Sequence, residues 1–235
     1  MKIEVLYPSC ANLYGEATAV KYLQQCLPQA EFIMTELDEE PAFAAEQVDM
    51  VFMGGMTEDT QELVIQSLLP YRSCIEERIE QNTVFLMVSN ALEIFGKYIE
   101  REDGSRIPAL GLFDTWAKRS MNRRYNSLVL GEMEGFSILG FKSQFSHSYG
   151  NNTKEYLFRV KRGSGLNPES DREGLRRRNF MATYLLGPVI LLNPSFLKYL
   201  LQLLGISQPQ LLYEDALQEA FNRRLAEFED QNTRD

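Results

Sequence analysis

The 235-residue sequence has little of the chemistry from which metal centres and disulfide frameworks are built. It contains a single histidine, His147, and three cysteines, Cys10, Cys26 and Cys74, that follow no close pairing motif. An odd number of scattered cysteines argues against a disulfide framework or a structural zinc site, so we expect reduced thiols. No Asp/Glu cluster at ligand spacing accompanies the lone imidazole. The sequence therefore predicts no metal and no cofactor.

Long apolar runs are also missing. No stretch of about 18 uncharged apolar residues occurs, which is the length that a helix needs to cross a bilayer. The first seven residues carry charge inside their apolar stretch, unlike a secretory signal peptide. We therefore expect a cytoplasmic protein without a membrane partner.

Acidic residues outnumber basic ones, which gives the chain a net charge of -9 at pH 7. Such a chain is a poor binder of nucleic acid, since phosphate contacts need clustered Lys and Arg. Residues 151–180 are a local exception, with basic side chains outnumbering acidic ones. A solvated face is the usual meaning of such a run, and a contact surface for an acidic partner or a phosphorylated ligand is the alternative. The basic residues are Lys154, Arg159, Lys161, Arg162, Arg172, Arg176, Arg177 and Arg178.

Apolar strands alternate with amphipathic helices in the first part of the chain. Strands are expected at 2–7, 31–35, 50–53 and 84–88, and helices up to about 27 and over 59–81, with a possible break at Pro70. Strands separated by helices at this spacing favour right-handed crossovers. The sequence thus predicts an α/β protein with a doubly wound, mostly parallel sheet.

The pattern changes after Gly104. Short runs at 127–130, 136–140 and 156–160 predict an antiparallel extension. A last helix is expected at about 209–230, with an apolar stripe formed by Leu217, Phe221, Leu225 and Phe228. We expect a main domain over 1–205 and a C-terminal helix within 206–235. The stripe is expected to dock on the sheet, and binding to a partner is the alternative.

Residues 84–96 read as an apolar strand that turns sharply into a helix, the pattern of a nucleophile elbow. With residues 49–55 and 182–188, this segment resembles the glutaminase domain of class I glutamine amidotransferases. The branch is that of cobyric acid synthase and the glutaminase subunit of lipid II isoglutaminyl synthase. There the elbow reads Cys-Gly-Gly-Tyr-Gln and the later segment Gly-Thr-Tyr-Leu-His-Gly-Pro. Here Ser89 takes the cysteine position and Leu186 the histidine position.

The resemblance covers about residues 7–194 and implies a flavodoxin-like fold. It also implies an oxyanion hole formed by the loop Gly54, Gly55 and Met56 together with the backbone amide of Asn90. Ser89 needs a general base to be a nucleophile at neutral pH, and a leucine at the base position has no ionisable atom. The alternative interpretation is that Ser89 serves only as a helix cap.

Five further residues are candidates for the pocket. Cys10 follows the first strand, where doubly wound sheets place ligand-binding atoms, although an inert loop thiol is the commoner case. Asn12 and Tyr184 belong to the matched segments. Glu93 adds negative charge after the elbow and would disfavour a substrate carboxylate if it faced the pocket. His147 is either a structural histidine or a substitute base.

These observations predict a protein of the amidotransferase family without Cys-dependent glutaminase activity. By resemblance, it would act as a scaffold or regulatory subunit of a synthetase such as a Mur-ligase-like protein. Two alternatives remain open. One is a hydrolase or amidase that uses Ser89, and the other is a small-molecule sensor that uses the inherited pocket.

Overall fold

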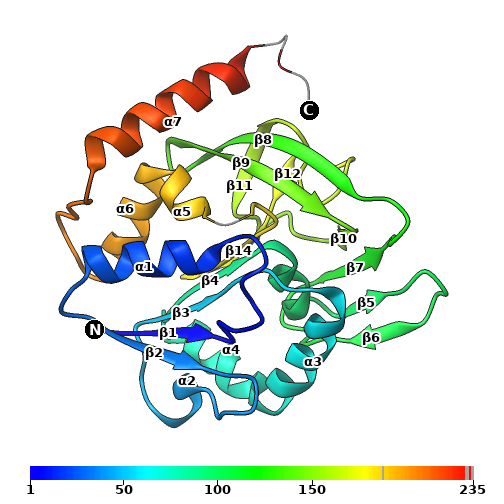
Figure 1. Cartoon of the computed structure of the whole chain (residues 1–235). Helices are drawn as coiled ribbons and strands as arrows, with labels where there is room; N and C mark the ends of the chain where they lie inside the picture. The colour runs from blue at the N-terminus through cyan, green and yellow to red at the C-terminus, as the bar shows by residue number, and fades with distance from the viewer. Residues whose placement is uncertain (187, 231–232, 234–235) are drawn as a thin grey trace.

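The computed structural model of the chain describes residues 1–186, 188–230 and 233 (Figure 1). A six-stranded sheet lies at its centre, in the order β13-β14-β4-β3-β1-β2. Its strands are β1 (Lys2–Leu6), β2 (Glu31–Thr35), β3 (Met50–Met53), β4 (Val84–Val88), β13 (Leu175–Arg177) and β14 (Phe180–Thr183). All neighbours in it are parallel except β13 and β14. The predicted doubly wound α/β fold and its four N-terminal strands are confirmed.

Helices cover both faces of this sheet (Figure 1). One face carries α1 (Glu16–Cys26), α5 (Val189–Leu192) and α6 (Pro194–Leu203), and the other carries α2 (Ala42–Ala45), α3 (Glu58–Leu68) and α4 (Arg72–Glu80). The expected break at Pro70 is confirmed, because the short 3₁₀ helix η1 (Leu69–Tyr71) separates α3 from α4. Proline has no N–H to donate to the helix ladder. The short helix α2 was not predicted.

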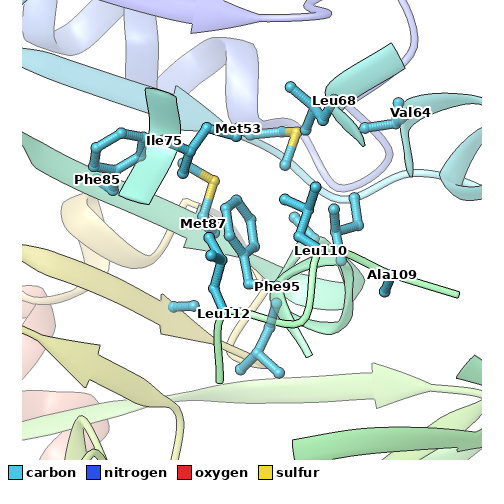
Figure 2. Close-up of a cluster of buried hydrophobic side chains, with 14 of the residues drawn as sticks. Met53, Val64, Leu68, Ile75, Phe85, Met87, Phe95, Ala109, Leu110 and Leu112 are labelled. Atoms are coloured by element: carbon cyan, nitrogen blue, oxygen red, sulfur yellow. The ribbon is translucent and has the colours of Figure 1, made fainter. Parts of the chain in front are cut away.

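The central strands are apolar on both sides, and alternate residues enter different cores. Met53 and Met87 pack with Val64 and Leu68 of α3 on one face (Figure 2). Phe52 and Leu86, one position away along the same strands, belong to the core under α1 and α6. This continuous burial fixes the strand register and therefore the positions of the loops at the strand ends.

Two four-stranded sheets form the extension. The first, in the order β10-β7-β5-β6, contains β5 (Tyr98–Glu100), β6 (Arg106–Pro108), β7 (Thr115–Arg119) and β10 (Ser146–Gly150). The second, in the order β12-β11-β8-β9, contains β8 (Tyr125–Met133), β9 (Phe136–Gln144), β11 (Phe158–Arg162) and β12 (Arg172–Glu173). The antiparallel runs near 127, 136 and 156 correspond to β8, β9 and β11. The first sheet was not predicted.

The last helix, α7 (Glu214–Glu229), lies along the outside of β8 and β9 (Figure 1). Phe221 and Phe228 are buried there with Leu130 and Leu139. Within the described residues these two side chains of the stripe therefore pack on the chain itself. Residues 231, 232, 234 and 235 of the expected C-terminal segment lie outside the described part.

The basic segment is largely neutralised by ion pairs. Arg162 donates instead to main-chain oxygens at the end of α7, reaching Phe228 O at 2.6 Å and Asp230 O at 2.7 Å. Paired side chains favour the solvated-face interpretation over a phosphate-binding surface. The ion pairs are Arg159–Asp171, Lys161–Glu132, Arg176–Glu134, Arg177–Glu155 and Arg178–Glu80.

Replacing Arg162 with alanine is expected to loosen α7, because the last carbonyl groups of a helix have no intrahelical donors. Hydrogen exchange of amides in α7 should accelerate several-fold in Arg162→Ala. The matched control is Arg159→Ala, since the Arg159–Asp171 pair is 58% exposed on both sides and exposed pairs contribute little. Equal protection of α7 in both variants would contradict the capping role.

Candidate functional site

The site predicted from the sequence lies at the carboxyl ends of the parallel strands. Gly54 follows β3, Ser89 follows β4, and the segment containing Leu186 follows β14. Neighbouring parallel strands end at the same edge, so these loops are brought together, as in other doubly wound sheets.

Ser89 adopts a left-handed backbone conformation, with φ of 59°. Non-glycine residues rarely adopt this conformation, which costs energy and is concentrated at functional sites. The chain turns sharply here, as the elbow pattern predicts. The helix that follows differs from the expectation, because η2 (Ser89–Phe95) is a 3₁₀ helix and all of its residues are buried.

The loop after β3 touches the elbow. A Cβ atom on Gly55 would lie 2.8 Å from Cβ of Ser89, and one on Gly54 would lie 2.1 Å from the carbonyl oxygen of Ala11. Such distances are too short for any side chain. The two glycines therefore allow the loop to pass between the elbow and the loop after β1.

The backbone N–H groups of this loop have partners. The N–H of Met56 donates to Asn90 Oδ1 at 3.0 Å, and Asn90 Nδ2 donates to the carbonyl oxygen of Met56 at 2.7 Å. The N–H of Gly55 donates to the buried carboxylate of Glu16 at 3.3 Å. The side chain of Asn90 thus hydrogen-bonds both the backbone N–H and the backbone carbonyl oxygen of Met56 across the site.

A cavity of about 170 Å³ opens over the elbow. Its lining includes Tyr14, Met56, Glu58, Ser89, Asn90, Arg124 and Gln144. In the described part of the chain, Ser89 Oγ forms no hydrogen bond to a side chain that can accept its proton. The guanidinium of Arg124 lies 4.5 Å from the ring centroid of Phe145 and gives the cavity one cation.

The position that the resemblance matches to the catalytic base holds an apolar side chain. Leu186 is 9% exposed, and its backbone N–H donates to the carbonyl oxygen of Phe141 at 2.9 Å. Gly187, the next residue of the matched motif, lies outside the described residues. A leucine here can exclude water but cannot move a proton.

Glu93 and Tyr184 lie behind the elbow and not on the lining of its cavity. The carboxylate of Glu93 accepts from Tyr184 Oη at 2.9 Å, from Gln61 Nε2 at 3.0 Å and from Ser146 Oγ. Desolvation raises the pKa of this fully buried carboxyl group, although its three donors oppose the shift. Glu93 faces the protein interior, so the condition under which it would repel a substrate carboxylate in the pocket is not met.

The network continues away from the elbow. Gln61 Nε2 also donates to the carbonyl oxygen of Asn90 at 2.6 Å, and Gln61 Oε1 accepts from Arg119 at 2.7 Å. The sequence patterns matched Gln61 to a family motif without giving it a role, and they did not predict roles for Arg119 and Ser146. Ser146 and Ser148, two positions apart on β10, bind Glu93 and Tyr184, as alternate residues on one side of a strand can do.

Cys10 and Asn12 also lie outside the lining of the elbow cavity. Burial raises the pKa of the half-buried Cys10 thiol, with Glu36 contributing in the same direction, so the thiolate is disfavoured. Asn12 Oδ1 accepts from the N–H of Ala17 at 2.8 Å, in the first turn of α1. Its side chain satisfies a helix-terminal amide.

His147 lies on β10, and its Nδ1 is 3.3 Å from Nε2 of Gln144. Burial lowers the pKa of this imidazole to about 4, and the charges of Lys142 and Arg123 contribute. His147 lines a neighbouring cavity and not the one at Ser89. No group of three metal-ligating side chains occurs among the described residues, and none of their helices has the length and apolarity of a bilayer span.

The architecture is that of the glutamine amidotransferases. A glutamine amidotransferase from Thermotoga maritima superposes with a TM-score of 0.54 at 11% identity, over 96% of this chain and 97% of that one. The PurLQS structure from the same organism gives 0.52 at 11% identity, over 95% and 98%. At these identities the likeness shows the fold alone.

Residues 2–191 match the CobB/CobQ-like glutamine amidotransferase domain, and the chain belongs to this family. It is 26% identical over 193 residues to the lipid II isoglutaminyl synthase (glutamine-hydrolyzing) subunit GatD of Staphylococcus aureus. The aligned region covers 81% of this chain and 79% of the relative. The corresponding subunit of Streptococcus pneumoniae is 24% identical over 200 residues, covering 83% and 76%.

The single histidine allows a direct test of the buried imidazole. Its NMR titration midpoint should lie at about 4, below the ordinary value of about 6.5. Between these values the unfolded chain binds a proton that the folded protein resists, so this group lowers stability as pH falls from about 6.5 to about 4. In His147→Gln that part of the pH dependence of urea unfolding should disappear. A midpoint near 6.5 would contradict the burial argument.

Proposed function

We propose that this chain is a non-catalytic member of its family, which keeps the amidotransferase scaffold as a binding subunit of a synthetase. The observation that carries the proposal is the bridge between Asn90 and Met56. Glutamine hydrolysis by this fold requires backbone donors that are free to stabilise an oxyanion. The Met56 N–H, which would be such a donor, instead binds a side-chain oxygen at 3.0 Å.

The missing base supports the same proposal. Leu186 cannot accept a proton from Ser89, and the imidazole of His147 lines a different cavity and stays neutral. Removing one member of a nucleophile–base unit typically lowers the rate by several orders of magnitude. A hydrolase based on Ser89 would need a general base, and among the described residues no side-chain acceptor is hydrogen-bonded to Ser89 Oγ.

The relatives support a role as a subunit. Both curated relatives are named as subunits of a lipid II isoglutaminyl synthase, and the match covers more than three quarters of each. We infer that this chain pairs with a synthetase of the Mur-ligase-like class in the cytoplasm. Leu13 on the cavity rim is 50% exposed, and Phe141, bonded to Leu186 through its carbonyl oxygen, is 39% exposed. Exposed apolar side chains beside a site suit a protein contact.

A small-molecule sensor is the second candidate. The elbow cavity is partly polar, and its lining carries the cation of Arg124 as well as the carboxylate of Glu58. An acidic ligand held without turnover would distinguish this function from that of a scaffold.

Ammonia release from glutamine tests the catalytic part of the proposal. The wild-type protein and Ser89→Cys should both match the rate without enzyme. The double variant Ser89→Cys/Leu186→His has a thiol and a base. The triple variant adds Asn90→Gly, which removes the acceptor from the Met56 N–H. Its rate of ammonia release should exceed that of the double variant by a factor of about 10² to 10³, the usual contribution of one oxyanion donor. Wild-type activity that is lost in Ser89→Ala would refute the proposal.

The pairing with a synthetase is tested by size-exclusion chromatography of the full chain with the isoglutaminyl synthase ligase subunit of its own organism. A complex is expected, and Leu13→Asp combined with Phe141→Asp should weaken it at least tenfold. Leu63→Asp is the matched control, because Leu63 on α3 is equally exposed at 52%. Separate elution of the two wild-type proteins, or equal weakening by the control, would contradict the proposed surface.

A further inference from the structure

A second cavity, of about 310 Å³, adjoins the cavity at the elbow. Gln144, at the end of β9, lines both cavities. The other walls of the second cavity include Tyr125, Lys142, His147 and Ser164. Ser89 is absent from its lining, so its chemistry is separate from that of the inherited site.

Two polar atoms of this wall lack hydrogen-bond partners among the described residues. They are Oε1 of Gln144 and Nε2 of His147, and their side chains are 7% and 8% exposed. Leaving a buried polar group unpaired costs about 1–3 kcal/mol. Two such atoms on adjoining side chains of one cavity indicate that a ligand group belongs there.

The hydrogen-bond pattern identifies which atom is the donor. Gln144 Nε2 donates to the carbonyl oxygen of Ser146 at 2.5 Å, which fixes the orientation of the amide. The same nitrogen lies 3.3 Å from His147 Nδ1, so Nδ1 accepts its second proton. A neutral imidazole with an accepting Nδ1 carries its proton on Nε2. The unpaired atoms are therefore one donor on His147 and one acceptor on Gln144.

The wall has no free charge for an ionic ligand. The ammonium group of Lys142 donates to the carbonyl oxygens of Ser164 at 2.8 Å and Gly165 at 2.7 Å, and it is paired with the buried carboxylate of Glu173. Three acceptors satisfy its three protons. The low pKa of His147 keeps its imidazole uncharged at neutral pH. The ligand group should therefore be neutral.

We propose that this cavity binds a neutral carboxamide group. Its carbonyl oxygen accepts from Nε2–H of His147, and its N–H donates to Oε1 of Gln144. The volume exceeds the roughly 30 Å³ of one water and reaches the range of small-ligand pockets, so a peptide amide or an amide side chain fits. The half-buried ring of Tyr125 covers the imidazole, with centroids 4.0 Å apart, so the proposed binding requires this ring to turn outward.

The single histidine again provides the readout. The full-length protein with ¹⁵N-labelled imidazole is titrated at pH 7 with propionamide, and in parallel with butanone and propionate. The free protein should show the tautomer protonated on Nε2. Propionamide should shift that signal saturably, in the millimolar range expected for so small a ligand. Butanone, which offers only an acceptor, and the charged propionate should bind at least tenfold more weakly.

Gln144→Met keeps the length of the side chain and removes the acceptor, and it should weaken propionamide at least tenfold. Gln24→Met on α1 is the matched control and should bind like the wild type. The tautomer and the ligand comparison use the unaltered protein, so they test the proposal even if Gln144→Met fails to fold. A proton on Nδ1, a response equal for all three probes, or no saturable shift would overturn it.

Discussion

The contact between the loop after β3 and the elbow at Ser89 is the constraint on which the rest of the site depends. Gly55 can approach Ser89 only because it has no side chain, and Ser89 turns the chain through a left-handed conformation. Both features cost conformational freedom that the surrounding structure must offset. The buried parallel strands β3 and β4 hold the two segments in register, so the contact follows from the packing of the central sheet.

Behind this contact, a buried polar network supports the elbow. Glu93 follows the elbow and receives donors from α3, β10 and the segment after β14. A buried carboxylate is tolerated only when its lone pairs are satisfied, and three donors achieve this here. The network fixes the back of the elbow, whereas at the front the Met56 N–H is bonded to the side chain of Asn90. Under the proposed function, the structural support of the elbow would have been kept while its catalytic groups were replaced.

Much of the fold followed from sequence patterns, and the reasons are physical. The strands at 50–53 and 84–88 are continuous apolar runs, the strand at 31–35 has three apolar residues at its centre, and the break at Pro70 follows from one missing N–H. The three-residue strands β5 and β6 are too short to show an alternation, so the sheet that contains them was not predicted. The matched motifs identified Ser89 and Leu186, which the sheet order brings to one edge.

The details of the site depended on contacts between distant segments, which no local pattern encodes. Asn90 was expected to contribute its backbone amide, and the contact of its side chain with Met56 was not predicted. Glu93 was considered as a pocket residue, yet burial and three partners turn it inward. Gln144 and Arg124 were not predicted as cavity residues, because a glutamine at the end of a strand and an arginine just before one have no motif of their own.

The position of Gln144 on two linings has a thermodynamic consequence. Its amide forms part of the partition between the elbow cavity and the cavity of His147. A molecule that fixes this side chain from one side changes the shape and hydrogen-bonding capacity of the other side. Linkage requires such an effect to be reciprocal, so ligands bound in the two cavities would change each other's affinity by the same coupling free energy.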